Sequence, residues 1–328
     1  MTRPPGGGST ARGFALMSGA FCALAVVMGS EGRHDLAMGL FIAPIAYYWA
    51  SGRSERSLLL ALMSVVSSVV GMGHPFGAVL ALLGIAAGVL LGEGFRRRWS
   101  FGWCTSALTA LLFGVAALNM LLHWEQSREM ATLSVSALIV QVEAYAAESG
   151  GDVPEAQIES LRQLGEFWPC VGMGIVFGCT LLSVTLLVAV VSALLRKRHP
   201  GVVSKQGFAR MRPPEWLVWA AIAMALLWFI DHRWPQDVVR VVAWNGAVAL
   251  FFVYCLNGLS ILVHAFRALR ALQLNPVLYY GALLLALLQG TYFLGSVGLF
   301  DTWWDLRARI ERLVEARKAQ GPPPLNGA

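Results

Sequence analysis

The chain has 328 residues, of which 57% are apolar and only 13% are charged. Soluble domains carry about a quarter charged residues, so this composition excludes an ordinary soluble domain and indicates a membrane protein. The formal net charge of +6 does not indicate nucleic-acid binding, because Lys and Arg gather on the cytoplasmic side of membrane proteins. The five cysteines form no Cys-x-x-Cys pair, so neither a disulfide framework nor a zinc site is predicted.

Nine apolar stretches follow one another, separated by linkers that hold nearly every charge. Hydrocarbon offers backbone N–H and C=O groups no partners, so continuous runs rich in Leu, Ala and Val must cross it as helices. After a disordered N-terminus, residues 1–13, we therefore predict an all-α, polytopic transmembrane helical bundle of eight or nine spans in a bacterial cytoplasmic (inner) membrane. The predicted spans are residues 14–30, 36–51, 57–73, 76–93, 101–123, 167–195, 215–231, 238–265 and 276–300.

Orientation follows from two segments of opposite charge. The linker 196–214 is basic, whereas residues 124–166 hold eight acids and two arginines. The positive-inside rule places the linker and the N-terminus in the cytoplasm and residues 124–166 outside. The bundle thus divides into an N-terminal part, 14–123, and a C-terminal part, 167–300.

The basic tail, residues 301–328, does not fit strict alternation, because nine crossings would leave it outside. One segment therefore does not cross, or the tail is external. The candidates for a segment that stays within the membrane are residues 36–51, residues 215–231, and the last span, which Gly290 could break into a re-entrant pair. The side of the C-terminus stays open.

Residues 124–166 are predicted to form an external hairpin of two amphipathic helices. In the first, apolar residues recur at helical spacing from Val135 to Tyr145. The second begins at Asp152, an acid followed by Pro154, as at many helix starts. The hairpin either covers the outer mouth of the bundle or lies flat on the membrane surface.

Small residues recur at four-residue intervals in three predicted spans, where they let another helix approach closely. Packing within the chain explains most such faces, and a separate membrane partner is the alternative for the first. The residues are Ala15, Gly19 and Ala23, then Gly84, Gly88 and Gly92, then Gly174 and Gly178.

Two polar stripes lie within predicted spans, where polar groups are costly and often functional. Each has its residues at i, i+3 and i+7, on one helix face. If the two helices pair antiparallel, the stripes line one cleft for a small-molecule solute. The alternative is interhelical hydrogen bonding, worth about 0.6 kcal/mol per contact. The candidate substrate-binding residues are Asn257, Ser260 and His264, then Gln289, Tyr292 and Ser296, with Asn119 and Asn245 as further contributors.

No motif for an enzyme is present. The sequence lacks a Walker loop, a dinucleotide fingerprint and a His-Glu-x-x-His helix. We predict no catalytic residue, no metal and no cofactor.

The end of the last span carries four residues that suggest a family: Gly298, Asp301, Asp305 and Arg307. They resemble the closing signature of the YybS-like family of predicted bacterial membrane proteins, a domain of unknown function. The resemblance implies an N-terminal part similar to the S subunits of energy-coupling-factor vitamin transporters. In S subunits a small-xxx-small face on the first helix docks a coupling subunit, and the matching face here is Ala15, Gly19 and Ala23. The chain is longer than a typical S subunit by the basic linker and at least two spans.

Three functions are weighed against these features, of which an intramembrane enzyme has the least support because no catalytic motif is present. The first is a transporter-like or solute-binding membrane component without its own ATPase. The second is a membrane scaffold or assembly factor that recruits cytoplasmic proteins or anionic lipid through the basic linker and tail. A ligand-sized cavity between the spans would favour the first, and a solid core with a basic cytoplasmic face the second.

Overall fold

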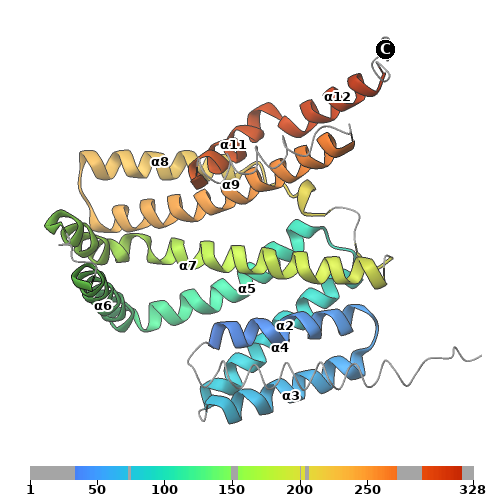
Figure 1. Cartoon of the computed structure of the whole chain (residues 1–328), viewed down its shortest axis with the longest axis horizontal. Helices are drawn as coiled ribbons and strands as arrows, with labels where there is room; N and C mark the ends of the chain where they lie inside the picture. The colour runs from blue at the N-terminus through green and yellow to red at the C-terminus, as the bar shows by residue number, and fades with distance from the viewer. Residues whose placement is uncertain are drawn as a thin grey trace, which may run out of the picture. The chain divides into compact units, whose positions relative to one another are not determined.

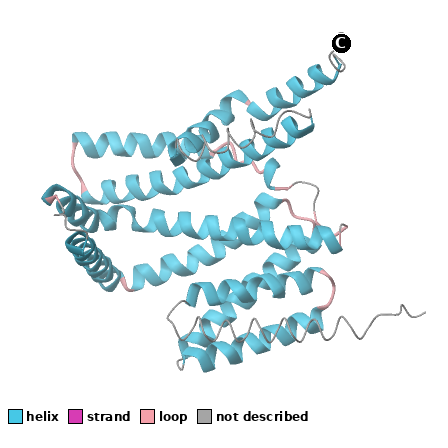
Figure 2. Ribbon diagram, in the orientation of Figure 1, coloured by secondary structure: helices cyan, strands magenta, loops and turns pink. Residues whose placement is uncertain are grey.

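The structure is a computed structural model that describes residues 34–72, 75–148, 154–199, 201–203, 207–271 and 290–319. Every regular element in this part of the chain is a helix (Figures 1 and 2). The chain divides into two compact units. One comprises Met1–Leu112 and Ser183–Gly207, and the other comprises Phe113–Leu182 and Phe208–Ala328.

From residue 34 onward, a described helix lies close to each of the predicted spans 36–51, 57–73, 76–93, 101–123, 215–231 and 238–265, whereas only residues 290–300 of the predicted span 276–300 are described. The predicted span 14–30 lies outside the described residues. The described elements are α2 (His34–Ala50), α3 (Ser54–Met72), α4 (Pro75–Arg96), α5 (Phe101–Leu122), α6 (Trp124–Glu148), α7 (Glu155–Arg198), the 3-10 turn η1 (Phe208–Arg210), α8 (Leu217–Arg233), α9 (Asp237–Ala271), α11 (Gly290–Trp304) and α12 (Leu306–Ala319).

Five described helices contain segments long and apolar enough to cross a membrane. A hydrocarbon core of about 30 Å needs about 20 apolar residues in helical form. The segments are Val79–Arg96, Phe101–Leu122, Trp124–Glu148, Gly165–Arg198 and Asp237–Ala268. Their length and composition support the prediction of an all-helical membrane protein.

The helix α7 differs from the expectation of a break near residue 166. It runs without interruption through 44 residues, so the predicted second amphipathic helix is its first part. The sequence boundary marks a change of polarity, and a helix need not end where it leaves an apolar environment. The preceding helix, α6, buries none of its residues. Its external position stays a prediction.

In the first unit, α4 packs directly on α2 through two of the predicted small residues. A methyl group added at Gly88 would lie 2.7 Å from Ile45 Cγ2, and one added at Gly92 would lie 2.8 Å from Trp49 Cβ. The helices are therefore held at a separation that only glycine permits. The Trp49 indole also donates a hydrogen bond to Glu93 Oε2 at 3.2 Å.

In the second unit, α8 and α9 form a hairpin, and α11 packs on α9 (Figure 1). The contacts advance together along both helices, since Gly295 lies against Phe251 and Gly298 lies against the Tyr254 carbonyl. The helices α9 and α11 are therefore parallel neighbours. Glycines on both make this possible, because a side chain at Gly298 would overlap the backbone of α9.

We expect Gly88→Leu to lower the stability of the protein. The larger side chain has no room against Ile45, and overpacking of this kind costs about 1–3 kcal/mol or more. The matched control is Gly114→Leu on α5, where no atom lies within 4 Å of an added Cβ. Thermal unfolding of the purified protein in detergent measures both. Equal unfolding midpoints for the two variants would contradict the close packing of α2 on α4.

Candidate functional site

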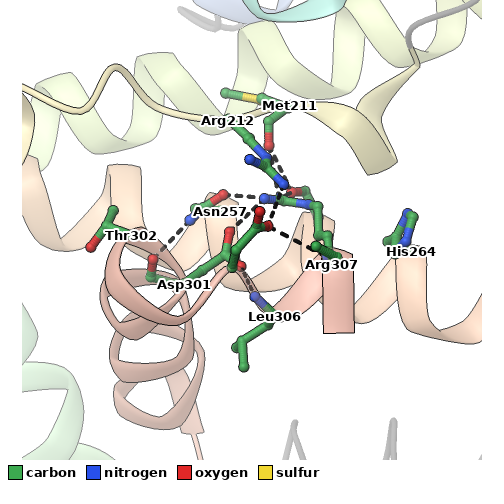
Figure 3. A network of polar contacts seen from close by, with 12 residues as sticks. Met211, Arg212, Asn257, His264, Asp301, Thr302, Leu306 and Arg307 are labelled. Atoms are coloured by element: carbon green, nitrogen blue, oxygen red, sulfur yellow. Dashed lines mark hydrogen bonds and ion pairs between the residues drawn. The ribbon is translucent and has the colours of Figure 1, made fainter. Parts of the chain in front are cut away.

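The strongest concentration of polar groups in the second unit surrounds the guanidinium of Arg307, which is 3% exposed. Arg307 is the second residue of α12, and its side chain points back toward α9 (Figure 3). Its Nη1 donates to Asp301 Oδ2 at 2.6 Å. Its Nη2 contacts Asn257 Oδ1 at 3.0 Å, the Met211 carbonyl at 2.9 Å and the Ser260 hydroxyl. We call these five residues the Arg307 network.

The buried Arg307 Nε has no hydrogen-bond partner among the described residues, whereas the side chains of Asn257 and Ser260 make further hydrogen bonds. Asn257 donates from Nδ2 to the Gly298 carbonyl at 2.7 Å, so its amide joins α9 to α11 while its oxygen receives Arg307. Ser260 donates to the Met211 carbonyl at 3.0 Å. The network thus connects α9, the end of α11, the start of α12 and the loop segment that follows η1.

A tight turn between α11 and α12 places Arg307 and Asp301 together. Asp305 adopts a positive φ of 40°, which is uncommon for a residue other than glycine. The Asp301 Oδ1 accepts from the Leu306 N–H at 2.8 Å and so caps the first turn of α12. Asp305 pairs with Arg212 at 2.6 Å, with both side chains about half exposed.

Burial and charge act in opposite directions on Arg307. Burial lowers the pKa of its guanidinium, while the nearby Asp301 carboxylate raises it. The net effect is a lowered pKa, but arginine is not deprotonated in proteins, so the side chain stays charged and the pair is ionic. Each ion loses its hydration, and only close geometry with additional hydrogen bonds offsets that loss. The network supplies both, and it therefore acts as an internal clamp with little capacity left for a solute.

The predicted substrate-binding residues separate into different environments. Asn257 and Ser260 belong to the Arg307 network, whereas His264, one turn further along α9, has its Nε2 3.5 Å from Glu311 Oε1 on α12. Tyr292 is 78% exposed on α11. The cleft was predicted on the condition that the two helices pair antiparallel, and the described parts of α9 and α11 run parallel instead (Figure 1). Ser296 and Asn119 are exposed and belong to no contact of the network, and Gln289 lies outside the described residues.

Asn245 has a local structural role beside a proline. Pro169 lies inside α7, where a proline cannot donate to the preceding turn. The Asn245 amide donates to the Pro169 carbonyl at 3.2 Å and accepts from the Gly174 N–H at 2.8 Å. Gly174 permits this contact, because an added Cβ would lie 2.6 Å from the Asn245 backbone oxygen. The Asn245 side chain therefore bonds the Pro169 carbonyl at the start of the turn that follows the proline and the Gly174 N–H at its end.

A separate groove of about 510 Å³ lies among α8, α9 and α11. Ligand sites in proteins are typically concavities of about 300–1,000 Å³ with mostly apolar linings. We call it the aromatic groove. Its aromatic and polar side chains include Trp228, Trp244, Phe251, Tyr254, Tyr292 and Ser296. Two of the predicted substrate-binding residues, Tyr292 and Ser296, thus lie at this groove and not at the Arg307 network.

Sequence reasoning missed the role of Met211, whose contribution is a backbone carbonyl that no side-chain pattern reveals. It also gave Asp231 only a place at a span end. Asp231 accepts from Arg240 Nε at 3.1 Å and from the Gln236 N–H at 3.2 Å, which fastens the turn between α8 and α9. The nine-residue separation of Asp231 and Arg240 across Pro235 was the available signal.

The long apolar helices of the described residues are those of a helical membrane protein. The chain belongs to the family described as "Predicted membrane protein (DUF2232)", which matches residues 36–302. No curated protein and no solved structure matches it.

We expect Arg307→Met to destabilise the protein by about 3–5 kcal/mol, because it leaves the Asp301 carboxylate buried without a counter-ion. Thermal unfolding in detergent measures the loss. The matched control is Arg212→Met, which breaks a half-exposed pair worth about 0–1 kcal/mol. Replacing both Asp301 and Arg307 by Leu should recover part of the loss, since no charge is then buried. An Arg307→Met variant as stable as Arg212→Met would contradict the clamp.

Proposed function

We propose that the chain is a transporter-like, solute-binding membrane component without its own ATPase, and that the solute binds in the aromatic groove. The observation that carries this proposal is the groove itself. It has the volume of a ligand site and is bounded by α8, α9 and α11. Its lining includes Tyr292 and Ser296, which the sequence pattern assigns to a substrate site.

The Arg307 network favours the groove over the polar stripe as the binding site. Asn257 and Ser260 are 2% and 0% exposed, and both are engaged by Arg307. A solute could reach them only by breaking an ion pair and its hydrogen bonds. The groove requires no such rearrangement.

The energy for transport would come from another subunit or from an ion gradient, because the sequence has no nucleotide-binding motif. Residues 14–123 resemble S subunits, and a coupling subunit that docks on this part of the chain would then be the partner. The face that would dock it, Ala15, Gly19 and Ala23, lies outside the described residues.

A scaffold function is the second candidate, and α12 favours it. Arg307 fixes the first turn of this helix, while Arg309, Arg312 and Leu313 further along are exposed. An anchored helix with exposed arginines suits an acidic protein surface or anionic lipid.

Native mass spectrometry of the full chain, purified gently from its own membrane, tests the two functions. The groove-filling variant is Ala225→Trp, and the control is Leu226→Trp, whose side chain is exposed on the same helix but does not line the groove. We expect one small molecule to co-purify with the wild type and with Leu226→Trp and to be lost from Ala225→Trp. A stable protein partner with no small molecule would instead favour the scaffold.

We further propose eight full spans, with both ends of the chain in the cytoplasm. The linker 196–214 is cytoplasmic by its charge. The Met211 carbonyl accepts from Arg307, and Arg212 pairs with Asp305. The start of the basic tail therefore lies beside the cytoplasmic linker, and the chain between them must cross the membrane an even number of times.

The segment that does not cross is then the last one. Its described part is the helix α11, Gly290–Trp304, and residues 276–289 of the predicted span lie outside the described residues. This helix starts at Gly290 with a φ of 76°, and it runs in the same direction as α9. These features support the re-entrant alternative for this segment.

Reporter fusions test this topology. We expect green fluorescent protein after Ala328 to be fluorescent and alkaline phosphatase at the same position to be inactive, because that end lies in the cytoplasm. A phosphatase fusion after Glu148, in the predicted external segment, is the positive control. An active phosphatase after Ala328 would mean nine spans.

A further inference from the structure

One end of the first unit, which the positive-inside rule places in the cytoplasm, gathers positive charge from three places along the sequence. The Trp49 hydrogen bond to Glu93 joins the ends of α2 and α4. The ring centroids of Tyr47 and His199 lie 6.1 Å apart, which joins the end of α2 to the residue after α7. The cations at these ends are Arg53 and Arg56, then Arg96, Arg97 and Arg98, then Arg196, Lys197 and Arg198.

Three of these cations converge on one hydroxyl group. Arg53, Arg56 and Arg198 all lie within electrostatic range of the Tyr48 hydroxyl, and no carboxylate is among the charges that act on it most strongly. The turn from α2 to α3 is tight, because Gly52 has a φ of 75° and the Arg53 N–H donates to the Tyr48 carbonyl at 3.0 Å. The fold thus brings Arg53 and Arg198 together from positions 145 residues apart. We call Arg53, Arg56 and Arg198 the Arg53 cluster.

Two members of the cluster lack a counter-ion among the described residues. Arg53 and Arg198 are exposed and belong to no ion pair there, whereas at the end of α4 both Arg96 and Arg97 pair with Glu93. Like charges held close together repel one another. The positive-inside rule explains why these arginines share one side of the membrane, but it does not require them to meet at one point. A bound anion would offset the repulsion.

An exposed apolar strip begins beside the cluster. Arg56, Leu59 and Met63 lie at i, i+3 and i+7 of α3 and so share one helix face. Leu59 is 53% exposed and Met63 is 36% exposed. Glu55, the acid in the first turn of α3, lies about 100° around the helix axis from Arg56 and therefore off this strip. Cations beside an apolar strip match the two parts of an anionic phospholipid, its phosphate and its acyl chains.

We propose that the Arg53 cluster binds the phosphate of an anionic phospholipid, and that an acyl chain of the same lipid lies along Leu59 and Met63. Basic pockets on the cytoplasmic side of membrane helices bind anionic headgroups in this way. A zwitterionic lipid suits the site less, because its ammonium group would meet the arginines. The site lies in the first unit and does not depend on the aromatic groove, so this proposal goes beyond the solute-binding function.

Native mass spectrometry of the full chain with added lipid tests the proposal. The purified, delipidated protein is titrated in detergent with dioleoyl-phosphatidylglycerol and, separately, with dioleoyl-phosphatidylcholine, which has the same chains and no net charge. We expect the wild type to bind the first phosphatidylglycerol more tightly. The double variant Arg53→Gln/Arg198→Gln should bind it about thirtyfold more weakly, since each basic residue near an anionic headgroup contributes about fivefold.

The matched control is the double variant Arg128→Gln/Arg162→Gln, which removes two exposed arginines from α6 and the first part of α7. It changes the net charge equally and should keep the wild-type affinity for phosphatidylglycerol. The variant Arg53→Lys/Arg198→Lys keeps both charges and should retain most of that affinity. Because Arg53 and Arg198 are exposed, all three variants should unfold at the wild-type temperature in phosphatidylcholine alone.

Photolabelling locates the bound lipid without any substitution. A phosphatidylglycerol with a diazirine on one acyl chain should label the wild type on α3, at or beside Leu59 and Met63. A label confined to other helices would overturn the proposal.

Three further results would overturn it. The first is equal affinity of the wild type for the two lipids, and the second is an equal loss of phosphatidylglycerol binding in the two Gln double variants. The third is inhibition by an equal concentration of glycerophosphoglycerol, the headgroup without its chains, because the site would then bind a free phosphate ester. The proposed solute function is tested separately, by loss of the small molecule from Ala225→Trp.

Discussion

The buried ion pair between Arg307 and Asp301 is the interaction on which the described part of the second unit depends. An isolated charge in an apolar interior is far more costly than the stability of a whole domain allows, so neither residue can be tolerated without the other. The pair gathers α9, α11, α12 and the chain after η1 at one point. A low-dielectric environment also makes every hydrogen bond of the network electrostatically stronger than it would be in water.

Glycine has a complementary role, because it determines where helix backbones come close enough for such contacts. Gly298 and Gly258 bring α11 against α9 and so place Asn257 within reach of the Gly298 carbonyl. Gly174 does the same for Asn245 and α7. In each case the side-chain amide of an asparagine hydrogen-bonds to the backbone of a glycine on the neighbouring helix. Close packing and polar satisfaction are therefore one feature of this fold.

Much of the fold follows from the sequence because apolar length and helical periodicity are local properties. The bounds of α2 to α5 and of α9 lie close to the predicted spans, and Gly88 and Gly92 lie where small-residue spacing predicts a helix contact. The site was less predictable. The interhelical pairing of Asn257 depends on the relative direction of α9 and α11, which no local pattern contains, and Met211 acts through its backbone. The residues Gly298, Asp301 and Arg307 resemble a family signature in the sequence. Only the three-dimensional structure shows that Gly298 and Arg307 hydrogen-bond to Asn257.

The sequence separation within the Arg307 network has a consequence for biosynthesis. Asn257 and Arg307 are 50 residues apart, and Arg307 is the later of the two to be synthesised. During translation α9 therefore enters the membrane before Arg307 exists, and the Asn257 side-chain oxygen then lacks its hydrogen-bond donor. A nascent chain that stops before residue 307 leaves the Asn257 oxygen and Asp301 Oδ2 without Arg307, whereas Ser260 can still donate to the Met211 carbonyl. Arrival of the first turn of α12 thus marks completion of the unit, and quality-control proteases that recognise polar groups in hydrocarbon would distinguish finished chains from truncated ones.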